Sequence, residues 1–192
     1  MKIVRTLSLG MLLLVACAAQ PKDPLYQGKT VSQWVRQLQD TDMNTSLTAA
    51  HALQQIGTDG IPFLVKDLGK PARGLGSASS ILAVMGADSI AAYLVVSEVS
   101  RVVASRNRDT RKDAIFILGQ IAGPIQLEGK RNHSSMVAML LRSASDQCRA
   151  SLMQGTKDKD AFLATLSTQY LAHADSVGAG MFLSPAPTRK RR

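Results

Sequence analysis

An apolar pattern of nine residues occurs three times in this chain of 192 residues and constrains the fold more than any other feature. The copies cover residues 49–57, 78–86 and 114–122. Each copy begins with Ala, carries an apolar residue and then Leu at its fourth and fifth positions, and ends with a large apolar residue followed by Gly or Ala. Apolar residues at spacings of three and four line one face of a helix. The pattern therefore predicts three helices that use equivalent positions for packing.

The rest of the chain also has helical spacing. Thr30 and Gln33 have the spacing of a capping box at the start of a helix over residues 30–39. Asp42 is placed to cap the next helix, and Gly57 to end it. Further helices are predicted over the segments 61–68, 88–105, 109–122, 133–154 and 158–175. No segment alternates between apolar and polar residues over several positions, so we expect no sheet.

These repeats resemble the HEAT-repeat family. The resemblance is closest over residues 28–68, where Gly28-Lys29-Thr30-Val31-Ser32-Gln33-Trp34 precedes Asp40-Thr41-Asp42 and the first copy of the pattern. In that family each repeat is a helical hairpin, small residues let neighbouring helices approach closely, and stacked hairpins share one core. The resemblance implies an all-α fold, a short HEAT-like α-solenoid of stacked helical hairpins.

The chain departs from the family pattern in two respects. The copies end at Gly57, Gly86 and Ala122, so their spacings of 29 and 36 residues are irregular and shorter than the roughly 40 to 47 of HEAT units. The family's basic residue is missing from the first copy, whereas Asp109 and Arg111 supply a similar pair in the third. We assign HEAT-like repeats to residues 29–123, and further helices to residues 124–180 from helical pattern alone.

The first residues have the organisation of a cleaved signal. Lys2 and Arg5 precede an apolar core that ends in Leu14-Val15-Ala16-Cys17, and this core is too short to span a bilayer. The ending resembles the lipobox of bacterial lipoproteins, with Leu three residues before a Cys. The alternative is ordinary secretion, with cleavage near Ala18 or Ala19 and loss of Cys17 with the signal.

The lipobox resemblance implies that residues 1–16 are removed and that Cys17 is lipidated, with palmitate among the acyl chains. Each buried CH₂ contributes about 0.8 kcal/mol to membrane binding, so several chains hold a protein firmly. Ala18 follows the cysteine where Asp would oppose sorting to the outer membrane. We therefore expect a lipid-anchored protein of the bacterial cell envelope, at the outer membrane and facing the periplasm. Residues 17–28, which include Pro21 and Pro24, are predicted to be a flexible tether.

Positive charge is concentrated at the end of the chain. The formal net charge of +9 falls to about +7 once Lys2 and Arg5 are removed, and four of these charges are Arg189, Lys190, Arg191 and Arg192. A nucleic-acid-binding protein would spread such charge over a face, so we expect no nucleic acid partner. Residues 181–192 are predicted to be a disordered basic tail that either contacts an anionic membrane surface or only adds solubility.

The sequence contains no convincing catalytic or metal-binding motif. Gly123 and Gly129 lie one residue too far apart for a phosphate-binding loop, and Arg131 replaces the required Ser or Thr. His51, His133 and His173 have no second ligand at helical spacing, so we expect no metal and no cofactor. Asp158 and Asp160 alternate with lysines and are interpreted as a solvated helix start.

Two further residues are assigned to the core. Cys148 would be the only cysteine of the mature chain besides Cys17, and no metal-ligand spacing surrounds it, so we predict a buried structural thiol. Trp34 lies in the apolar stripe with Val31, Val35 and Leu38. We therefore predict that it packs internally, although tryptophan is also favoured at binding hot spots.

These observations predict a membrane-anchored binding module rather than an enzyme. It would offer a helical surface to a protein partner in the cell envelope, with the lipid bilayer held through acylated Cys17. The alternative is an enzyme or enzyme accessory, since some HEAT-like bacterial proteins resemble phycobilisome lyases, which handle bilin chromophores. A third hypothesis is that the apolar residues between 88 and 105 form the face of a homo-oligomer.

Overall fold

The computed structural model describes residues 22–71, 76–88, 91–131 and 136–178. The prediction of an all-α fold is confirmed over these residues, since helices account for nearly all of their regular structure. The elements are β1 (Leu25–Tyr26), β2 (Lys29–Thr30), α1 (Val31–Gln37), α2 (Met43–Ile56), the 3₁₀ turn η1 (Gly57–Gly60), α3 (Ile61–Lys66), α4 (Ala78–Gly86), α5 (Ala92–Ser100), α6 (Arg108–Arg131), α7 (Met136–Gly155) and α8 (Ala161–Gly178).

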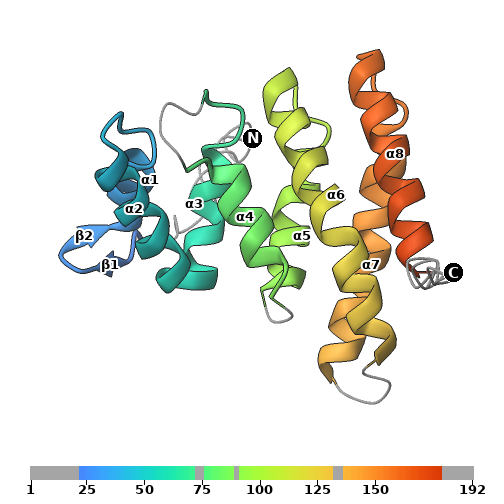
Figure 1. The fold of residues 1–192 in the computed structure, drawn as a ribbon, viewed down its shortest axis with the longest axis horizontal. Helices are drawn as coiled ribbons and strands as arrows, with labels where there is room; N and C mark the ends of the chain where they lie inside the picture. The colour runs from blue at the N-terminus through green and yellow to red at the C-terminus, as the bar shows by residue number, and fades with distance from the viewer. Residues whose placement is uncertain (1–21, 72–75, 89–90, 132–135, 179–192) are drawn as a thin grey trace, which may run out of the picture.

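The helices pack in two rows. In one row α1 contacts α3, α3 contacts α5 and α5 contacts α7; in the other row α2, α4, α6 and α8 follow one another in the same way. Each helix of the first row also packs on the helix that follows it in the sequence: α1 on α2, α3 on α4, α5 on α6 and α7 on α8. These contacts join the two rows. The elements therefore succeed one another from β1 and β2 at one end to α8 at the other (Figure 1).

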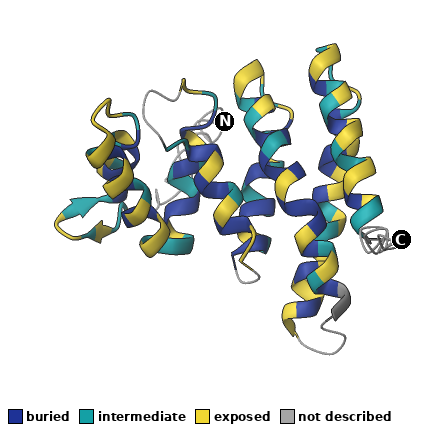
Figure 2. Ribbon diagram, in the orientation of Figure 1, coloured by how far each residue is buried: buried dark blue, intermediate teal, exposed yellow. Residues whose placement is uncertain are grey.

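All three copies of the apolar pattern lie in the second row. The first copy forms the end of α2, the second is α4, and the third lies in the middle of α6. The leucines at their fifth positions, Leu53, Leu82 and Leu118, are each completely buried. The equivalent positions predicted from the sequence are thus used alike, facing a core that runs through the row (Figure 2).

Local sequence signals set the first helix boundaries as predicted. The Thr30 amide donates to Gln33 Oε1 at 2.7 Å and the Gln33 amide donates to Thr30 Oγ1 at 3.3 Å, completing the capping box of α1. Asp42 Oδ2 accepts from the Thr45 amide at 2.8 Å and so caps α2. Gly57 ends α2 with a φ of 68°, in the left-handed region that glycine adopts without strain.

Residues 22–28 differ from the prediction of a tether and no sheet. Leu25 pairs with Thr30 and Tyr26 with Lys29 in a short antiparallel hairpin, whose two-residue turn has positive φ at both Gln27 and Gly28. Positive φ at both central residues is the type I′ pattern, and Gly28 supplies one of the two without strain. The prediction of no sheet missed this hairpin because two-residue strands are too short to show an alternation of apolar and polar residues.

Three side chains join the hairpin and the residues before it to α1. Trp34 Nε1 donates to the Tyr26 carbonyl at 3.0 Å, and Lys29 Nζ lies 4.3 Å from the centroid of the Trp34 ring. Asp23 Oδ1 accepts from the Ser32 amide at 3.2 Å. The Trp34 side chain is only 3% exposed, which confirms its predicted place in the core.

The later helices are longer or shorter than predicted. Helix α6 continues through Pro124 to Arg131, although proline removes one helical hydrogen bond and costs about 3 kcal/mol in a helix interior. Gln120 and Pro124 are both exposed, so water can reach the carbonyl that loses its partner. In the opposite sense, α5 ends at Ser100, and residues 101–107 form the turn to α6 instead of continuing the helix.

Small residues and one thiol fill the contacts between α6, α7 and α8. A Cβ atom on Gly119 of α6 would overlap the ring of Tyr170 on α8, so only glycine fits this approach. Cys148 of α7 is completely buried and its thiol donates to the Leu118 carbonyl at 3.3 Å. This burial confirms the prediction of a buried thiol, and it raises the pKa of the thiol to about 12.

Within the described residues, no helix combines the length and the apolar character needed to cross a bilayer. The predicted signal over residues 1–16, Cys17 and the basic tail over residues 181–192 lie outside the described residues.

Candidate functional site

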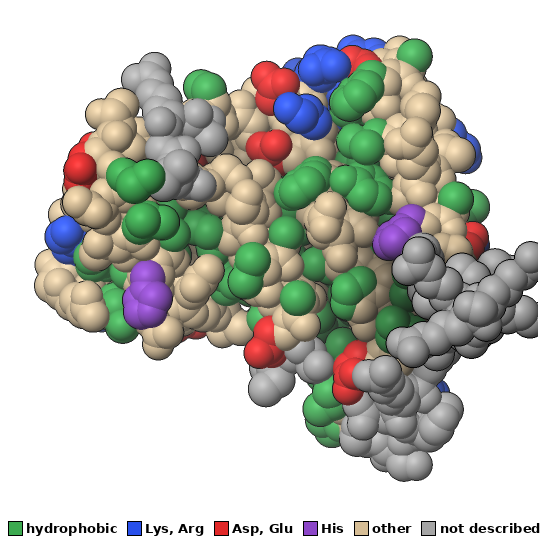
Figure 3. Space-filling model, in the orientation of Figure 1, with side chains coloured by type: hydrophobic (Ala, Val, Ile, Leu, Met, Phe, Trp, Pro, Cys, Tyr) green, Lys and Arg blue, Asp and Glu red, His purple; other side chains and the backbone are tan. Residues whose placement is uncertain are grey.

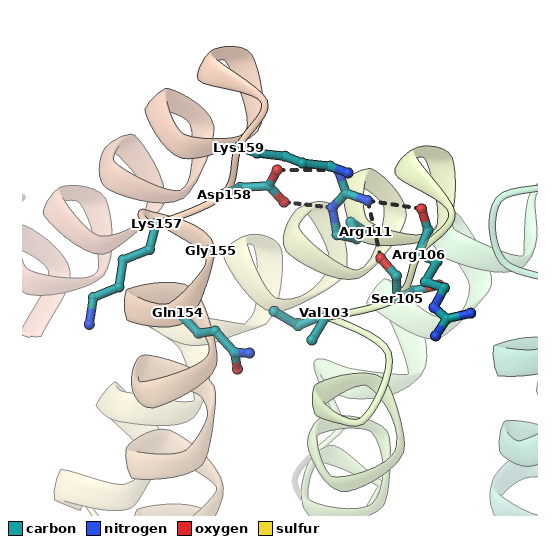
Figure 4. A pocket seen from close by; sticks show the side chains of 10 residues that line it. Val103, Ser105, Arg106, Arg111, Gln154, Gly155, Lys157, Asp158 and Lys159 are labelled. Atoms are coloured by element: carbon teal, nitrogen blue, oxygen red, sulfur yellow. Dashed lines mark hydrogen bonds and ion pairs between the residues drawn. The ribbon is translucent and has the colours of Figure 1, made fainter.

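The best candidate site is an open pocket between the α5–α6 turn and the α7–α8 turn (Figure 4). Its volume is about 480 Å³. The α5–α6 side contributes residues 103–106, the α7–α8 side contributes Gln154, Gly155 and residues 157–159, and Arg111 reaches in from the first turn of α6. The pocket thus lies where the α5–α6 pair meets the α7–α8 pair.

A buried ion pair joins the two sides of this pocket. Arg111 Nε and Nη2 donate to the two carboxylate oxygens of Asp158 at 2.6 and 3.2 Å. The two side chains are 8% and 6% exposed. Arg111 Nη1 also donates to the carbonyls of Ser105 and Arg106 at 3.1 and 3.3 Å. Arg111 therefore fixes the α5–α6 turn and the α7–α8 turn relative to each other.

Asp158 is held in its charged form. Burial alone would raise the pKa of this carboxyl, but hydrogen bonds from Arg111 and from the Asp160 amide lower it below its ordinary value. Next to it, Arg108 Nε donates to Asp160, and this bond lowers the pKa of Asp160. Both carboxylates at the start of α8 are thus engaged by arginines of α6, and side chains of both charges gather at this edge of the molecule (Figure 3).

Three other cationic side chains of the lining remain without such a partner. Arg106, Lys157 and Lys159 are exposed, and none of them forms an ion pair within the described part of the chain. Figure 4 shows Lys157 and Arg106 on opposite flanks of the opening, with Gln154 and Val103 between them. The lining carries four cationic side chains and one carboxylate, a net charge of +3.

Most backbone amides at the starts of the two helices beside the pocket are already occupied. At the start of α8, Asp158 Oδ1 accepts from the Asp160 amide at 2.8 Å, and Asp160 Oδ1 accepts from the amides of Phe162 and Leu163 at 3.0 and 3.3 Å. At the start of α6, Asn107 Oδ1 accepts from the amides of Asp109 and Thr110. An anion in this pocket would therefore be bound by side chains and not by helix N-termini.

A second distinctive surface region of the described residues lies at the far end of α6 and the start of α7. Large apolar side chains are exposed there: Leu127, Met136, Val137, Met139 and Leu140. Met136 is 75% exposed and Met139 is 63% exposed. Exposed methionines are flexible, polarizable contact residues, so this α7 tip is a surface that a protein partner can bury.

The structure corrects one interpretation of the candidate residues. Asp158 is not part of a solvated helix start, because its side chain is buried against Arg111, which lies 47 residues earlier in the chain. Asp160 does start α8 as predicted, through its bonds to Phe162 and Leu163. Sequence reasoning singled out Arg111 as a family-like basic residue and Asp158 as half of a charge pattern, but no local signal linked the two.

The other sequence candidates do not converge on a site. Cys17 and Arg189 to Arg192 lie outside the described residues, and so does His133. His51 and His173 are both exposed and lie on different helices. Among the described residues no group of three or more His, Cys, Asp or Glu side chains is placed to hold a metal ion. Residues 123–130 lie within α6, so they do not form a phosphate-binding loop.

Comparison with models of known protein families, with curated proteins and with solved structures found no match to this chain.

Proposed function

We propose that this chain is a lipid-anchored protein of the bacterial cell envelope whose domain is a short HEAT-like α-solenoid that binds another protein. It acts as a scaffold and not as an enzyme, and it needs no cofactor. Cys17 carries the lipid, at the outer membrane and facing the periplasm. The tail from Arg189 to Arg192 either contacts the anionic membrane surface or only adds solubility.

The packing order of the helices supports the solenoid part of this proposal. Each helix contacts its neighbour in sequence and the helix two positions along, as stacked hairpins do. The three copies of the apolar pattern occupy α2, α4 and α6 of one row, with their central leucines in the same buried role. Repetition of one buried position along a row is the property that relates repeats in such folds.

The surface supports the binding part, and the exposed α7 tip is the observation that carries it. Five large apolar side chains lie open there, between two helices that pack closely elsewhere. Leaving such side chains in water forgoes about 25 cal/mol for each Å² that burial would remove from contact with water. A partner that covers the tip gains this free energy, and the adjacent helices are already ordered to receive it.

The proposed location at the membrane rests on the sequence of the first residues. Leu14-Val15-Ala16-Cys17 resembles a lipobox and follows a charged start and an apolar core. Residues 18–21 then separate the lipidated cysteine from the described domain, which begins at Lys22. The domain would therefore lie close to the bilayer, within reach of other envelope proteins.

Affinity capture from solubilised bacterial membranes tests this function. The bait is the full-length lipoprotein, and the matched control carries Met136→Ser and Met139→Ser, which removes two exposed apolar side chains of the α7 tip and no buried one. We expect the parent to recover a defined envelope protein in stoichiometric amounts and the control to recover several-fold less.

Two outcomes would contradict the proposal. Recovery of no protein by the parent would remove the binding function. Recovery of a bound pigment, or turnover of a chromophore by the purified protein, would favour the alternative of an enzyme accessory that resembles phycobilisome lyases.

A further inference from the structure

We infer that the pocket between the α5–α6 and α7–α8 turns binds an acidic segment of the protein partner. The inference rests on the proposed function and adds to it the chemistry of one contact. The ligand class is a run of Asp and Glu carboxylates, held by Arg106, Lys157 and Lys159.

The positive charge of the pocket lining favours an anionic ligand. Asp158 is the only carboxylate among the lining residues, and both of its oxygens accept bonds from Arg111. The remaining positive charges therefore have no counter-charge within the described residues that form the pocket. Positive side chains around a concave surface raise the local concentration of anions and speed their association.

The second argument concerns which anion fits. Phosphate groups are commonly bound by free amides at a helix N-terminus or by the two-pronged guanidinium of arginine. Here the amides at the starts of α6 and α8 are bonded to Asn107, Asp158 and Asp160. The buried guanidinium of Arg111 is bonded to Asp158 and to two carbonyls. These amides and the Arg111 guanidinium are therefore unavailable for a phosphate, and among the lining residues only the Arg106 guanidinium is left to bind one.

The third argument is the spread of the remaining cations. Lysine is a point charge on a flexible stem, and it tolerates a range of acceptor positions. Lys157 and Arg106 flank the pocket on opposite sides (Figure 4), so carboxylates spaced along a chain can each meet a different cation. The volume of about 480 Å³ falls in the range of about 300 to 1,000 Å³ typical of ligand pockets, which admits side chains of an extended segment.

A peptide-binding measurement tests this inference on the full chain in neutral detergent. The probe is a fluorescein-labelled peptide of ten glutamates with an amidated C-terminus, and binding is followed by fluorescence anisotropy at two salt concentrations. The test variant carries Lys157→Glu and Lys159→Glu, which makes the net charge of the lining negative. The control carries Arg36→Glu and Lys66→Glu, exposed residues elsewhere, and changes the net charge of the protein equally.

We expect the test variant to weaken peptide binding by about tenfold or more at low salt, and the control to weaken it by less than about twofold. The basic tail is present in every protein, so it cannot cause a difference between the two variants. Absence of binding by the parent, equal losses in both variants, or no loss in either would overturn the inference. Competition by inorganic phosphate well beyond that of acetate at equal ionic strength would also overturn it, in favour of a phosphate site.

Failure of this inference can be told apart from failure of the proposed function. If the parent captures a partner from membranes but the Lys157→Glu, Lys159→Glu variant captures as much of it, the scaffold function stands and the acidic segment is wrong. If the parent captures no partner, the scaffold function fails whatever the peptide does.

Discussion

Among the glycines of the described residues, Gly119 is the one at which an added Cβ atom would come closest to another atom. A Cβ atom there would overlap the ring of Tyr170 on α8, so α6 and α8 would have to move apart. We predict that Gly119→Ala lowers the free energy of unfolding by about 2 kcal/mol, as overpacking of a close contact does. Urea denaturation followed by circular dichroism measures this loss.

Gly129 provides the matched control on the same helix. A Cβ atom there would meet only ordinary contacts with Arg142 and Leu141, at 3.6 Å or more. Gly129→Ala should therefore raise the free energy of unfolding by about 0.5 to 1 kcal/mol, because alanine is the better helix former. Equal changes in the free energy of unfolding for the two substitutions would show that α6 and α8 do not approach each other closely at Gly119.

Asp158 makes stability depend on pH through its bond to Arg111. The pKa of Asp158 is lower in the folded chain than the ordinary value of 3.8 that it has when unfolded. The pair therefore contributes its full stability above that value and loses it as the pH falls through the lower, folded pKa. We predict that Asp158→Asn lowers the free energy of unfolding by about 2 kcal/mol at pH 7 and reduces the acid sensitivity below about pH 4.

Asp175→Asn is the comparison for this pair. Asp175 is bonded to Arg149, but both side chains are about half exposed, so the loss should stay below about 1 kcal/mol. Chemical denaturation at several pH values separates the two variants. If Asp158→Asn were no more costly than Asp175→Asn, Arg111 would not be joining the two turns.

At the scale of elements, the β1–β2 hairpin is the largest difference from the sequence-based prediction, which made residues 17–28 a flexible tether. Trp34→Phe keeps the apolar ring but removes the indole N–H that donates to Tyr26. We predict a loss of about 1 kcal/mol and faster cleavage by trypsin after Lys29. Limited proteolysis with mass spectrometry measures the cleavage rate.

Tyr26→Phe serves as the control, since the tyrosine hydroxyl accepts only one long exposed bond, from Gln27 at 3.4 Å. Its cleavage rate should match that of the parent. If the parent itself were cut after Lys22 and Lys29 as fast as an unstructured peptide, residues 22–28 would be a tether after all.

Element positions were predictable wherever a local signal exists. The capping box at Thr30, the cap at Asp42 and the glycine stop at Gly57 each depend on residues close in sequence, and each is confirmed. The extension of α6 through Pro124 was missed because packing of Ile125 and Gly129 offsets the free energy lost at the proline. That packing involves residues distant in sequence, so the local pattern does not predict it. The pocket was missed for the same reason, since Arg111 and Asp158 meet only in three dimensions.

At the scale of the whole molecule, the apolar residues of α5 are explained by packing within one chain. Val95, Val96 and Val99 are completely buried against the other helices of the same chain, so they do not supply the face of a homo-oligomer. Leu94 of α5 is 42% exposed, and further exposed apolar side chains are scattered over other helices, but five of them gather on the α7 tip. The charged pocket lies at the opposite end of α7. Two different surfaces are thus open to partners.

The lipid anchor is tested by the two cysteines. We predict that the parent incorporates labelled palmitate when expressed in a bacterium that lipidates its own lipoproteins, and that Cys17→Ser incorporates none. Cys148→Ser should incorporate as much label as the parent, because the Cys148 thiol is buried and its pKa is raised. Label that persists in Cys17→Ser would place the lipid on another residue, and a parent without label would favour ordinary secretion with loss of Cys17.

The central claim, that this domain holds a protein partner at a membrane, is tested most directly by where the captured partner sediments. Its membrane-bound fraction is measured in cells that express the parent, Cys17→Ser, or Cys148→Ser. The account predicts that the partner sediments with membranes when the parent or Cys148→Ser is present, and that a substantial part of it moves to the soluble fraction with Cys17→Ser. An unchanged distribution across all three would contradict the account.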